Sequence, residues 1–242
     1  LLVCEHASKV IPRSLGDLMG QDEVLRAEAP LGRMLGSGRL ASVILWGPPG
    51  CGKTTLARLL AKEVGEPLMA LSAVMSGVAD VREAFKEAKK LRARGRRPIL
   101  FIDEIHRFNR AQQDGLLHEV EDGTVTLVGA TTENPSFALV AALLSRCLVI
   151  VLSRLSDEAL LGLVARAEDH LGHRLPLSEA ARHRLAELAD GDGRYLVNMV
   201  ETLAALPPEP VLDVEALADV LQRRLPVYDK QQEAHYNVIS AL

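Results

Sequence analysis

The chain has 242 residues, 48% of them hydrophobic, and its 28 basic and 32 acidic residues give a net charge of −4. This size and hydrophobic content predict a globular protein with one large domain, or with an α/β domain followed by a smaller one. The nearly balanced charge excludes a surface that attracts nucleic acid over its whole extent, so any contact with DNA is expected to be local.

The cysteines and the apolar runs indicate in which cellular compartment the protein is expected. Cys4, Cys51 and Cys147 show neither a CxxC spacing nor a Cys/His spacing, which argues against a disulfide framework and against a zinc site. No segment has the order of a signal peptide, and no apolar run has the length of a membrane span. We therefore expect a cytoplasmic protein in a reducing environment, without a membrane partner.

The first strong signal in chain order is a phosphate-binding sequence. Residues 1–20 are predicted to form an irregular arm, and a short helix is expected around 31–35, before a buried parallel strand at 42–46. The pattern G-x-x-x-x-G-K-[ST] then fits residues 47–54 at every fixed position. A helix is expected at 53–64, so strand, loop and helix follow in the order that a P-loop requires.

This pattern predicts a site for a nucleoside triphosphate with Mg²⁺. Glycines allow the loop to fold tightly, so that consecutive backbone N–H groups point at phosphate oxygens. The Lys53 ammonium is expected to reach the β- and γ-phosphates, and the Thr54 hydroxyl to coordinate the magnesium ion. The residues predicted to contact the nucleotide in this stretch are Gly47, Pro48, Pro49, Gly50, Cys51, Gly52, Lys53, Thr54 and Thr55.

The segment after the P-loop helix combines a strand, expected at 67–71, with an amphipathic helix at 80–94 that Asp80 is expected to cap. The end of this helix carries many basic residues, which could touch nucleic-acid phosphates. The helix dipole also favours cations at a C-terminus, so a solvated face is the preferred interpretation. These residues are Lys86, Lys89, Lys90, Arg92, Arg94, Arg96 and Arg97.

Two carboxylates end the next strand, which is expected at 98–104. Ligands of open α/β sheets bind outside the carboxyl ends of the strands, which places Asp103 and Glu104 beside the phosphate loop. Asp103 is predicted to hold the magnesium ion, and Glu104 to polarise the water that attacks the γ-phosphate. Both could instead merely cap a helix, but a P-loop about 50 residues earlier favours catalysis. His106 lacks a second histidine at i+4, so we interpret it as structural or as a support for the catalytic groups.

Polar residues also follow the fourth expected strand, 124–129, which comes after a helix at 111–120. A hydroxyl at this carboxyl edge of the sheet could hold the attacking water or sense the γ-phosphate. Thr132 is the residue predicted for this role, and Thr131 is the nearest alternative.

The chain then changes from α/β to purely helical character. A short helix at 136–144 and a fifth strand at 148–152 flank Arg146, which by spacing alone is a surface arginine. Ser156 and Ser178 are expected to cap the first two helices that follow. Because no strand signal remains, a second, all-helical domain is predicted. Its helices are expected at 157–170, 178–189, 195–206 and 213–223.

Four stretches resemble the AAA+ ATPases, and more narrowly the replication-associated recombination protein A family, which includes the eukaryotic Werner helicase-interacting ATPase. They are ILWGPPGCGKTTLAR at 44–58, ILFIDEIHRFNRAQQD at 99–114, LVGATTENPSF at 127–137 and ALLSRC at 142–147. The resemblance implies an AAA+ P-loop αβα sandwich with a five-stranded parallel sheet, followed by a small all-helical lid domain. It implies an ATPase domain at 1–154, the lid domain at 155–225 and the start of a truncated C-terminal assembly domain at 226–242.

The resemblance also implies roles for residues that spacing leaves open. Arg146 corresponds to the arginine finger that reaches the γ-phosphate of a neighbouring subunit. Arg194, within ADGDGRYLVNMVE at 189–201, corresponds to the lid arginine called sensor 2, which acts within its own subunit. The segment that flanks adenine in the family corresponds to Leu18, Met19 and Gly20.

As a function, the resemblance implies a DNA-dependent ATP hydrolase that acts on stalled replication forks and single-strand/duplex junctions in replication-linked recombination and repair. The implied partners are DNA, single-strand-binding protein and further copies of the chain, with tetramers in the full-length family, in a nucleoid-associated location. One alternative is a clamp-loader-like ATPase subunit, which shares SRC at 145–147 but not HRFNRAQQD or TTENPSF. Another is an ATP-gated DNA-binding recruitment scaffold with little turnover, against which the intact Glu104 argues.

Overall fold

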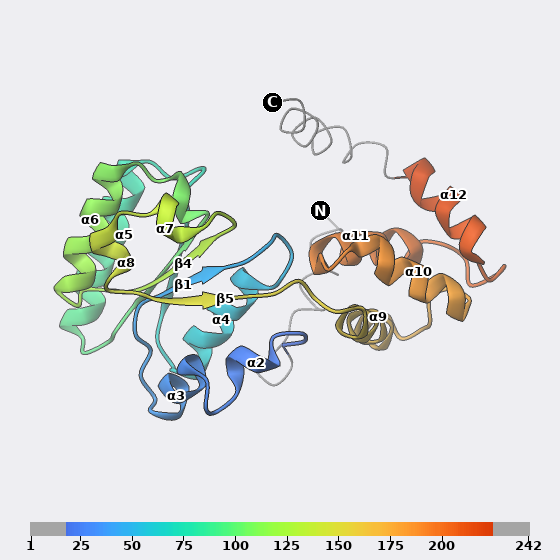
Figure 1. Ribbon diagram of the computed structural model, residues 1–242, viewed down its shortest axis with the longest axis horizontal. Helices are drawn as coiled ribbons and strands as arrows, with labels where there is room; N and C mark the ends of the chain where they lie inside the picture. Colours follow the sequence, from blue (N-terminus) through green and yellow to red (C-terminus); the bar gives the residue numbers. More distant parts are fainter. Residues whose placement is uncertain (1–17, 225–242) are drawn as a thin grey trace. The chain divides into compact units, whose positions relative to one another are not determined.

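The computed structural model describes residues 18–224, which form two compact units (Figure 1). One unit extends to Leu155 and the other begins at Ser156, and each is described here by itself. The predicted N-terminal arm lies mostly outside the described residues, and the predicted start of an assembly domain at 226–242 lies wholly outside them. Among the described residues, no helix has the length and the apolar character to cross a membrane.

The first unit is built on a five-stranded parallel sheet in the order β2-β3-β4-β1-β5. Because all strands run in the same direction, their carboxyl ends meet at one edge, where ligands of such sheets bind. This confirms the five-stranded parallel sheet expected from the sequence. The strands are β1 (Val43–Trp46), β2 (Leu68–Ser72), β3 (Ile99–Asp103), β4 (Thr126–Thr131) and β5 (Leu148–Val151).

Helices cover both faces of this sheet, which makes the predicted αβα sandwich (Figure 1). On one face lie α2 (Asp22–Leu25), α3 (Pro30–Gly36) and α4 (Lys53–Glu63). On the other lie α5 (Val78–Ala93), α6 (Arg110–Glu121), α7 (Pro135–Ala138) and α8 (Ala141–Leu144).

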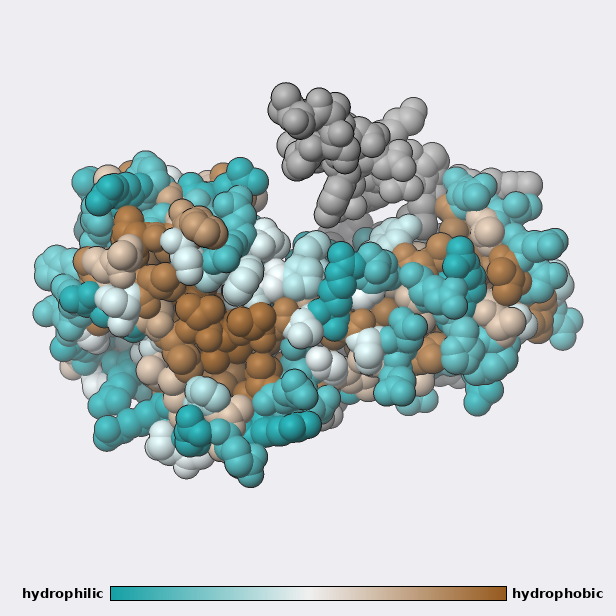
Figure 2. Space-filling model, viewed as in Figure 1, coloured by the Kyte–Doolittle hydropathy of each residue, from teal (hydrophilic) through white to brown (hydrophobic). Residues whose placement is uncertain are grey.

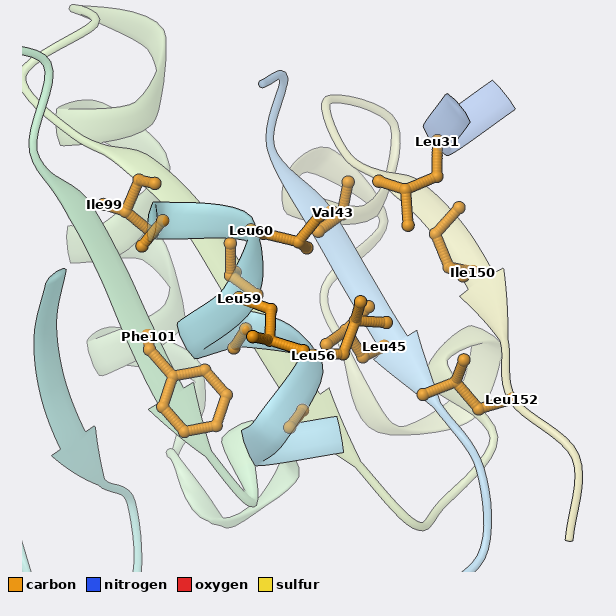
Figure 3. Close-up of a cluster of buried hydrophobic side chains, with 14 of the residues drawn as sticks. Leu31, Val43, Leu45, Leu56, Leu59, Leu60, Ile99, Phe101, Ile150 and Leu152 are labelled. Atoms are coloured by element: carbon orange, nitrogen blue, oxygen red, sulfur yellow. The ribbon is translucent and has the colours of Figure 1, made fainter. Parts of the chain in front are cut away.

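The apolar face of α4 fixes the position of the phosphate loop relative to the sheet. Leu56 and Leu60, one helical turn apart on α4, are fully buried, and they pack with Leu45 of β1 and Phe101 of β3 (Figure 3). Burying a leucine side chain is worth about 1.5–3 kcal/mol, so this contact holds the helix firmly behind the loop. Gly65, with φ +68°, lies just past the helix end, where a C-capping glycine was expected.

In the first unit, the start of α5 and the helix expected at 136–144 differ from the expectation from the sequence. Helix α5 begins at Val78, and Asp80 is its third residue, whose carboxylate accepts a hydrogen bond from the Gly77 N–H (2.7 Å). The helix expected at 136–144 is two short helices, because the chain is extended at Leu139 and Val140.

A side chain from α6 holds that break in place. The Gln113 Nε2 donates to the Ala138 carbonyl (3.2 Å), and its Oε1 accepts from the Val140 N–H (2.8 Å). One buried amide thus satisfies two backbone groups that a continuous helix would have paired internally.

The second unit consists of α9 (Asp157–Leu171), α10 (Glu179–Ala189), α11 (Gly193–Ala204) and α12 (Val214–Arg224). The Ser156 and Ser178 hydroxyls accept hydrogen bonds from the third residue of α9 and α10, each at 3.2 Å, which confirms both as N-caps. Helix α11 begins two residues earlier than expected, because the Asp192 carboxylate accepts from the backbone N–H groups of Arg194 and Tyr195.

Candidate active site

The loop between β1 and α4 has a backbone that requires glycine. Gly50 and Gly52 have φ values of +68° and +98°, a conformation that residues with a Cβ rarely adopt. A Cβ on Gly47 would lie 2.5 Å from the Leu152 carbonyl oxygen and 3.1 Å from the Cys51 sulfur, so no larger residue fits there. The fixed glycines of the motif therefore serve the close turn for which they were predicted.

The Lys53 side chain lies inside this loop. It is 8% exposed, and its Nζ donates to the carbonyls of Gly47 (2.7 Å) and Pro48 (2.8 Å). The ammonium is thus held among the backbone of the loop, at the positive end of α4. A phosphate group fits this loop, because both the Lys53 ammonium and the first backbone N–H groups of α4 favour an anion.

The segment before α2 rests against the same loop. The Leu18 side chain is buried, and its Cδ1 lies 3.6 Å from the place that a Cβ on Gly52 would take. Met19 and Gly20, also predicted to flank adenine, are half-buried beside it. This arrangement puts the segment next to the P-loop, and its contact with adenine stays a prediction.

Sequence reasoning missed Gln21, which joins three parts of the unit. Its side chain is 4% exposed, and its Nε2 donates to the carbonyls of Cys51 (3.2 Å) and Ser153 (2.8 Å). The amide thus ties the segment before α2 to the P-loop and to the chain that leaves β5. A buried glutamine carries no local sequence signal, because its partners are 30 and 132 residues away.

The two predicted carboxylates follow one another at the carboxyl end of β3. Asp103 is the last residue of the strand and is half-buried. Glu104 has φ +52° and ψ +47°, a left-handed backbone that costs a residue other than glycine about 1–2 kcal/mol. A strained backbone of this kind persists only where surrounding contacts stabilise it, and the side-chain contacts of Glu104 provide this stabilisation.

Glu104 lies within a polar cluster formed by the turn after β3 (Ile105–Arg107) and the end of β4. The Glu104 Oε2 lies 3.2 Å from the His106 Nδ1 and 3.4 Å from the Thr132 hydroxyl. The same Nδ1 lies 3.0 Å from the Thr131 hydroxyl, and the other ring nitrogen lies 3.4 Å from the Glu133 carboxylate. Glu133 was not among the predicted site residues.

Thr131, the last residue of β4, and Thr132, which follows it, differ in what they can reach. Thr131 is fully buried, and its hydroxyl accepts from the Glu133 N–H (3.0 Å) and donates to the Glu133 carbonyl (3.3 Å). Thr132 is exposed at the carboxyl edge, and its hydroxyl faces Glu104. This placement supports the choice of Thr132 over Thr131 as the group nearer to a reacting water.

The donor set suits a magnesium ion held jointly with phosphates. In the part of the chain that the structure describes, no group of three or more His, Cys, Asp or Glu side chains could hold a metal ion. Mg²⁺ uses few protein ligands and completes its shell with phosphate oxygens and waters. Thr54, at the start of α4, and Asp103, at the end of β3, both belong to the carboxyl edge of the sheet and fit that pattern.

Arg146 is not brought together with these groups. It follows α8 and precedes β5, at the amino edge of the sheet. Its guanidinium forms an ion pair with Glu121 and donates to the Ala142 carbonyl (2.8 Å). A role in its own phosphate site is therefore excluded by position, whereas a role toward a neighbouring copy is compatible with it.

Arg194 lies in the first turn of α11, in the second unit, and its side chain is exposed. The helix start that carries it is fixed by the Asp192 cap, which accepts from the Arg194 N–H at 2.8 Å. Its predicted role as a lid arginine stays a prediction.

The basic cluster at the end of α5 is largely paired with acidic residues. Lys89 contacts Glu119 (2.7 Å), and Lys90 contacts Glu87 (3.0 Å). Ion pairs also join Arg92 to Asp122 at 3.7 Å and Arg96 to Glu66 at 3.0 Å. Because four of its seven cations are paired with acidic residues, the cluster fits the solvated face preferred from the sequence better than a DNA contact.

Comparison with protein families finds two matches along the chain. The family described as "ATPase family associated with various cellular activities (AAA)" matches residues 43–155. The family described as "AAA C-terminal domain" matches residues 171–242.

Comparison with individual proteins points the same way. Replication-associated recombination protein A of Escherichia coli K12 is 43% identical over 98% of this chain and 55% of its own length. ATPase WRNIP1 of Dictyostelium discoideum is 40% identical over 96% of this chain and 29% of its own. The chain thus spans about half the length of the E. coli relative and a smaller share of the D. discoideum relative. Among solved structures, the RuvB Holliday junction branch migration motor of Thermotoga maritima aligns with a TM-score of 0.72 at 28% identity, covering 88% of this chain and 72% of that one.

Proposed function

The chain is an AAA ATPase and belongs to the family of replication-associated recombination protein A and WRNIP1, and from this membership we propose that the full-length protein couples ATP hydrolysis to work on DNA. The proposed substrates are stalled replication forks and junctions between single-stranded and duplex DNA. The observation that carries the enzymatic part is that the P-loop with its buried Lys53 and the Asp103-Glu104 pair lie at the same edge of the sheet.

In the proposed mechanism, the loop N–H groups and Lys53 bind the triphosphate and draw charge from the β- and γ-phosphates. Thr54 and Asp103 would hold Mg²⁺, which neutralises charge on the same phosphates. Glu104 accepts a proton from the attacking water, and Thr132 helps to orient that water. The separation of Arg146 from its own phosphate loop supports a role as an arginine finger for a neighbouring copy.

That role requires an oligomer, and the surroundings of Arg146 are compatible with one. The residue lies two positions before β5, which is an edge strand of the sheet. Apolar surface gathers over this part of the first unit (Figure 2), and Val151 of β5 is exposed. Apolar surface at a sheet edge is of the kind that a second copy can cover. Tetramers, contact with single-strand-binding protein and a nucleoid-associated cytoplasmic location belong to the same proposal.

The experiment that tests the proposal is ATP turnover of the full-length protein with and without forked DNA, for the wild type and for Glu104→Gln. We expect forked DNA to raise wild-type turnover, and Glu104→Gln to bind ATP but to release phosphate at least about 100-fold more slowly. Turnover that responds only to a sliding clamp would favour the clamp-loader alternative. Turnover as fast in Glu104→Gln as in the wild type would refute the role assigned to Glu104.

A further inference from the structure

His106 is the most enclosed titratable side chain of the polar cluster around Glu104. Its side chain is 4% exposed, whereas those of Glu104 and Glu133 are 32% and 58% exposed. A buried imidazole with only apolar neighbours would merely fill space in the core. Here both ring nitrogens face polar groups, which belong to the end of β4 and to the segments that follow β3 and β4.

The hydrogen-bond inventory decides which atom carries the proton on this side of the ring. The Thr131 hydroxyl has one hydrogen, and the geometry directs it to the Glu133 carbonyl, while the hydroxyl oxygen accepts from the Glu133 N–H. That oxygen can then only accept from the His106 Nδ1. The Glu104 carboxylate, also within reach of Nδ1, can likewise only accept when it is ionised. Nδ1 is therefore assigned as the N–H donor to both groups.

This donor acts on one oxygen of Glu104. The His106 Nδ1 and the Thr132 hydroxyl both contact Oε2, at 3.2 and 3.4 Å. Oε1 is then the oxygen we assign to the attacking water. When one carboxylate oxygen is fixed, the base loses less orientational freedom as it accepts the proton. A misplacement of the base by about 1 Å can cost about 100-fold in rate.

From these contacts we propose that His106 is a positioning residue, which holds Glu104 in its left-handed conformation and links it to the polar end of β4. The link runs from Glu104 through the imidazole to Thr131 and Glu133, so a shift of β4 would move the base. This inference rests on the proposed hydrolysis at Glu104 and extends it, because it assigns a task to a residue that acts through Glu104.

The test compares His106→Asn and His106→Gln, together with His106→Ala, in the full-length protein. The amide nitrogen of asparagine can take the place of Nδ1, whereas that of glutamine reaches toward the place of Nε2. We expect His106→Ala and His106→Gln to lower kcat about 10–100-fold with KM for ATP within about 3-fold, and His106→Asn to recover most of kcat. His118→Ala, an exposed histidine on α6, is the matched control and should change neither value.

A second comparison separates positioning from a general loss of packing. If His106 acts through Glu104, His106→Ala should change the residual turnover of Glu104→Gln by no more than about 3-fold, because residues that act as a unit are not additive. A further loss of 10-fold or more in that background, or equal recovery by asparagine and glutamine, would overturn the proposal.

A spectroscopic measurement decides the question without turnover. NMR of the ¹⁵N-labelled imidazole should show a proton on Nδ1 of His106, with a signal that shifts in Glu104→Ala and stays unchanged in His118→Ala. A proton on Nε2 alone, indifferent to Glu104, would refute the inference. Absence of wild-type turnover would instead refute the proposed function, and the NMR result would still decide the contact.

Discussion

Arg146 and Lys53 lie at opposite edges of the same parallel sheet. Lys53 follows the carboxyl end of β1, whereas Arg146 precedes the amino end of β5, and these two strands pair in register from Val43 with Leu148. A four-residue strand spans about 13 Å, so the guanidinium cannot serve the phosphate site of its own subunit. If Arg146 acts as an arginine finger, as proposed, it must therefore serve the phosphate site of another copy.

Lys53→Ala should abolish tight nucleotide binding. The ammonium is held inside the phosphate loop by the carbonyls of Gly47 and Pro48, and removal of one such electrostatic group costs about 100–1,000-fold in rate. The change is measured by fluorescent-nucleotide binding and by phosphate release. Lys86→Ala, which removes an exposed lysine on α5, should leave both within about 2-fold. Unchanged affinity in Lys53→Ala would mean that the nucleotide binds elsewhere.

Gly47→Ala should destabilise the first unit. The added Cβ would lie 2.5 Å from the backbone carbonyl of Leu152, so the backbone must shift, at a cost of about 1–3 kcal/mol. Gly115→Ala is the control, because its Cβ meets nothing within 4 Å in α6 and alanine favours a helix by about 1 kcal/mol. Thermal melting should show a lower Tm for the first variant and an equal or higher Tm for the second. A Gly47→Ala protein as stable as the wild type would contradict the packing described for the loop.

Gln21→Ala should weaken both the fold of the first unit and its affinity for ATP. The variant leaves the carbonyls of Cys51 and Ser153 without their side-chain donor, and a buried group that loses its partner costs about 1–3 kcal/mol. Gln21→Met keeps the length of the side chain and removes the amide. If methionine restores the Tm and the affinity, packing rather than hydrogen bonding explains the role of Gln21.

The Cys147 thiol should react slowly in the folded protein. Burial raises the pKa of this thiol from its ordinary 9.0 to about 11. The thiolate fraction at pH 8 is then about 0.1%, against about 9% in the unfolded chain. Iodoacetamide labelling of the Cys147 peptide at pH 8, followed by mass spectrometry, should be at least 10-fold slower in the native protein than in urea. Equal rates would show that the thiol is not shielded.

The raised pKa of Cys147 also predicts how the stability of the fold changes with pH. The fold favours the neutral Cys147 thiol. The contribution of this thiol to stability is therefore complete below pH 9.0 and is lost as the pH rises from there toward about 11. Between these values the unfolded chain has released the proton and the folded chain has not, so the unfolding free energy falls with pH. Cys147→Ala should flatten this part of the curve of Tm against pH.

The sequence predicted the sheet and most helices because their signals are local. Buried parallel strands such as 99–103 form continuous apolar runs, and the helices show apolar residues at helical spacing. The P-loop could be predicted for the same reason, since its pattern is contiguous. The break between α7 and α8 could not, because its support comes from Gln113, 27 residues before Val140.

The polar cluster around Glu104 shows the same limit at the site. Glu104 and the two threonines were predicted from their positions at strand ends, because parallel strands share one carboxyl edge, whereas Glu133 was not predicted. The contact of His106 with Glu104 depends on the left-handed turn between them, which no pattern in the sequence indicates. The pairing of Arg146 with Glu121 is equally hidden, since the two residues come from different helix ends.

The most direct test of the account is to mix two inactive variants of the full-length protein. Lys53→Ala cannot use its own phosphate site but keeps Arg146, and Arg146→Ala keeps the site but lacks the finger. Each alone should show little ATP turnover, and an equal mixture should regain about a quarter of wild-type turnover, because half of the sites are intact and half of those meet an intact neighbour. The recovery should rise with protein concentration. A mixture no more active than the sum of its parts would contradict the claim that neighbouring copies complete each other's sites.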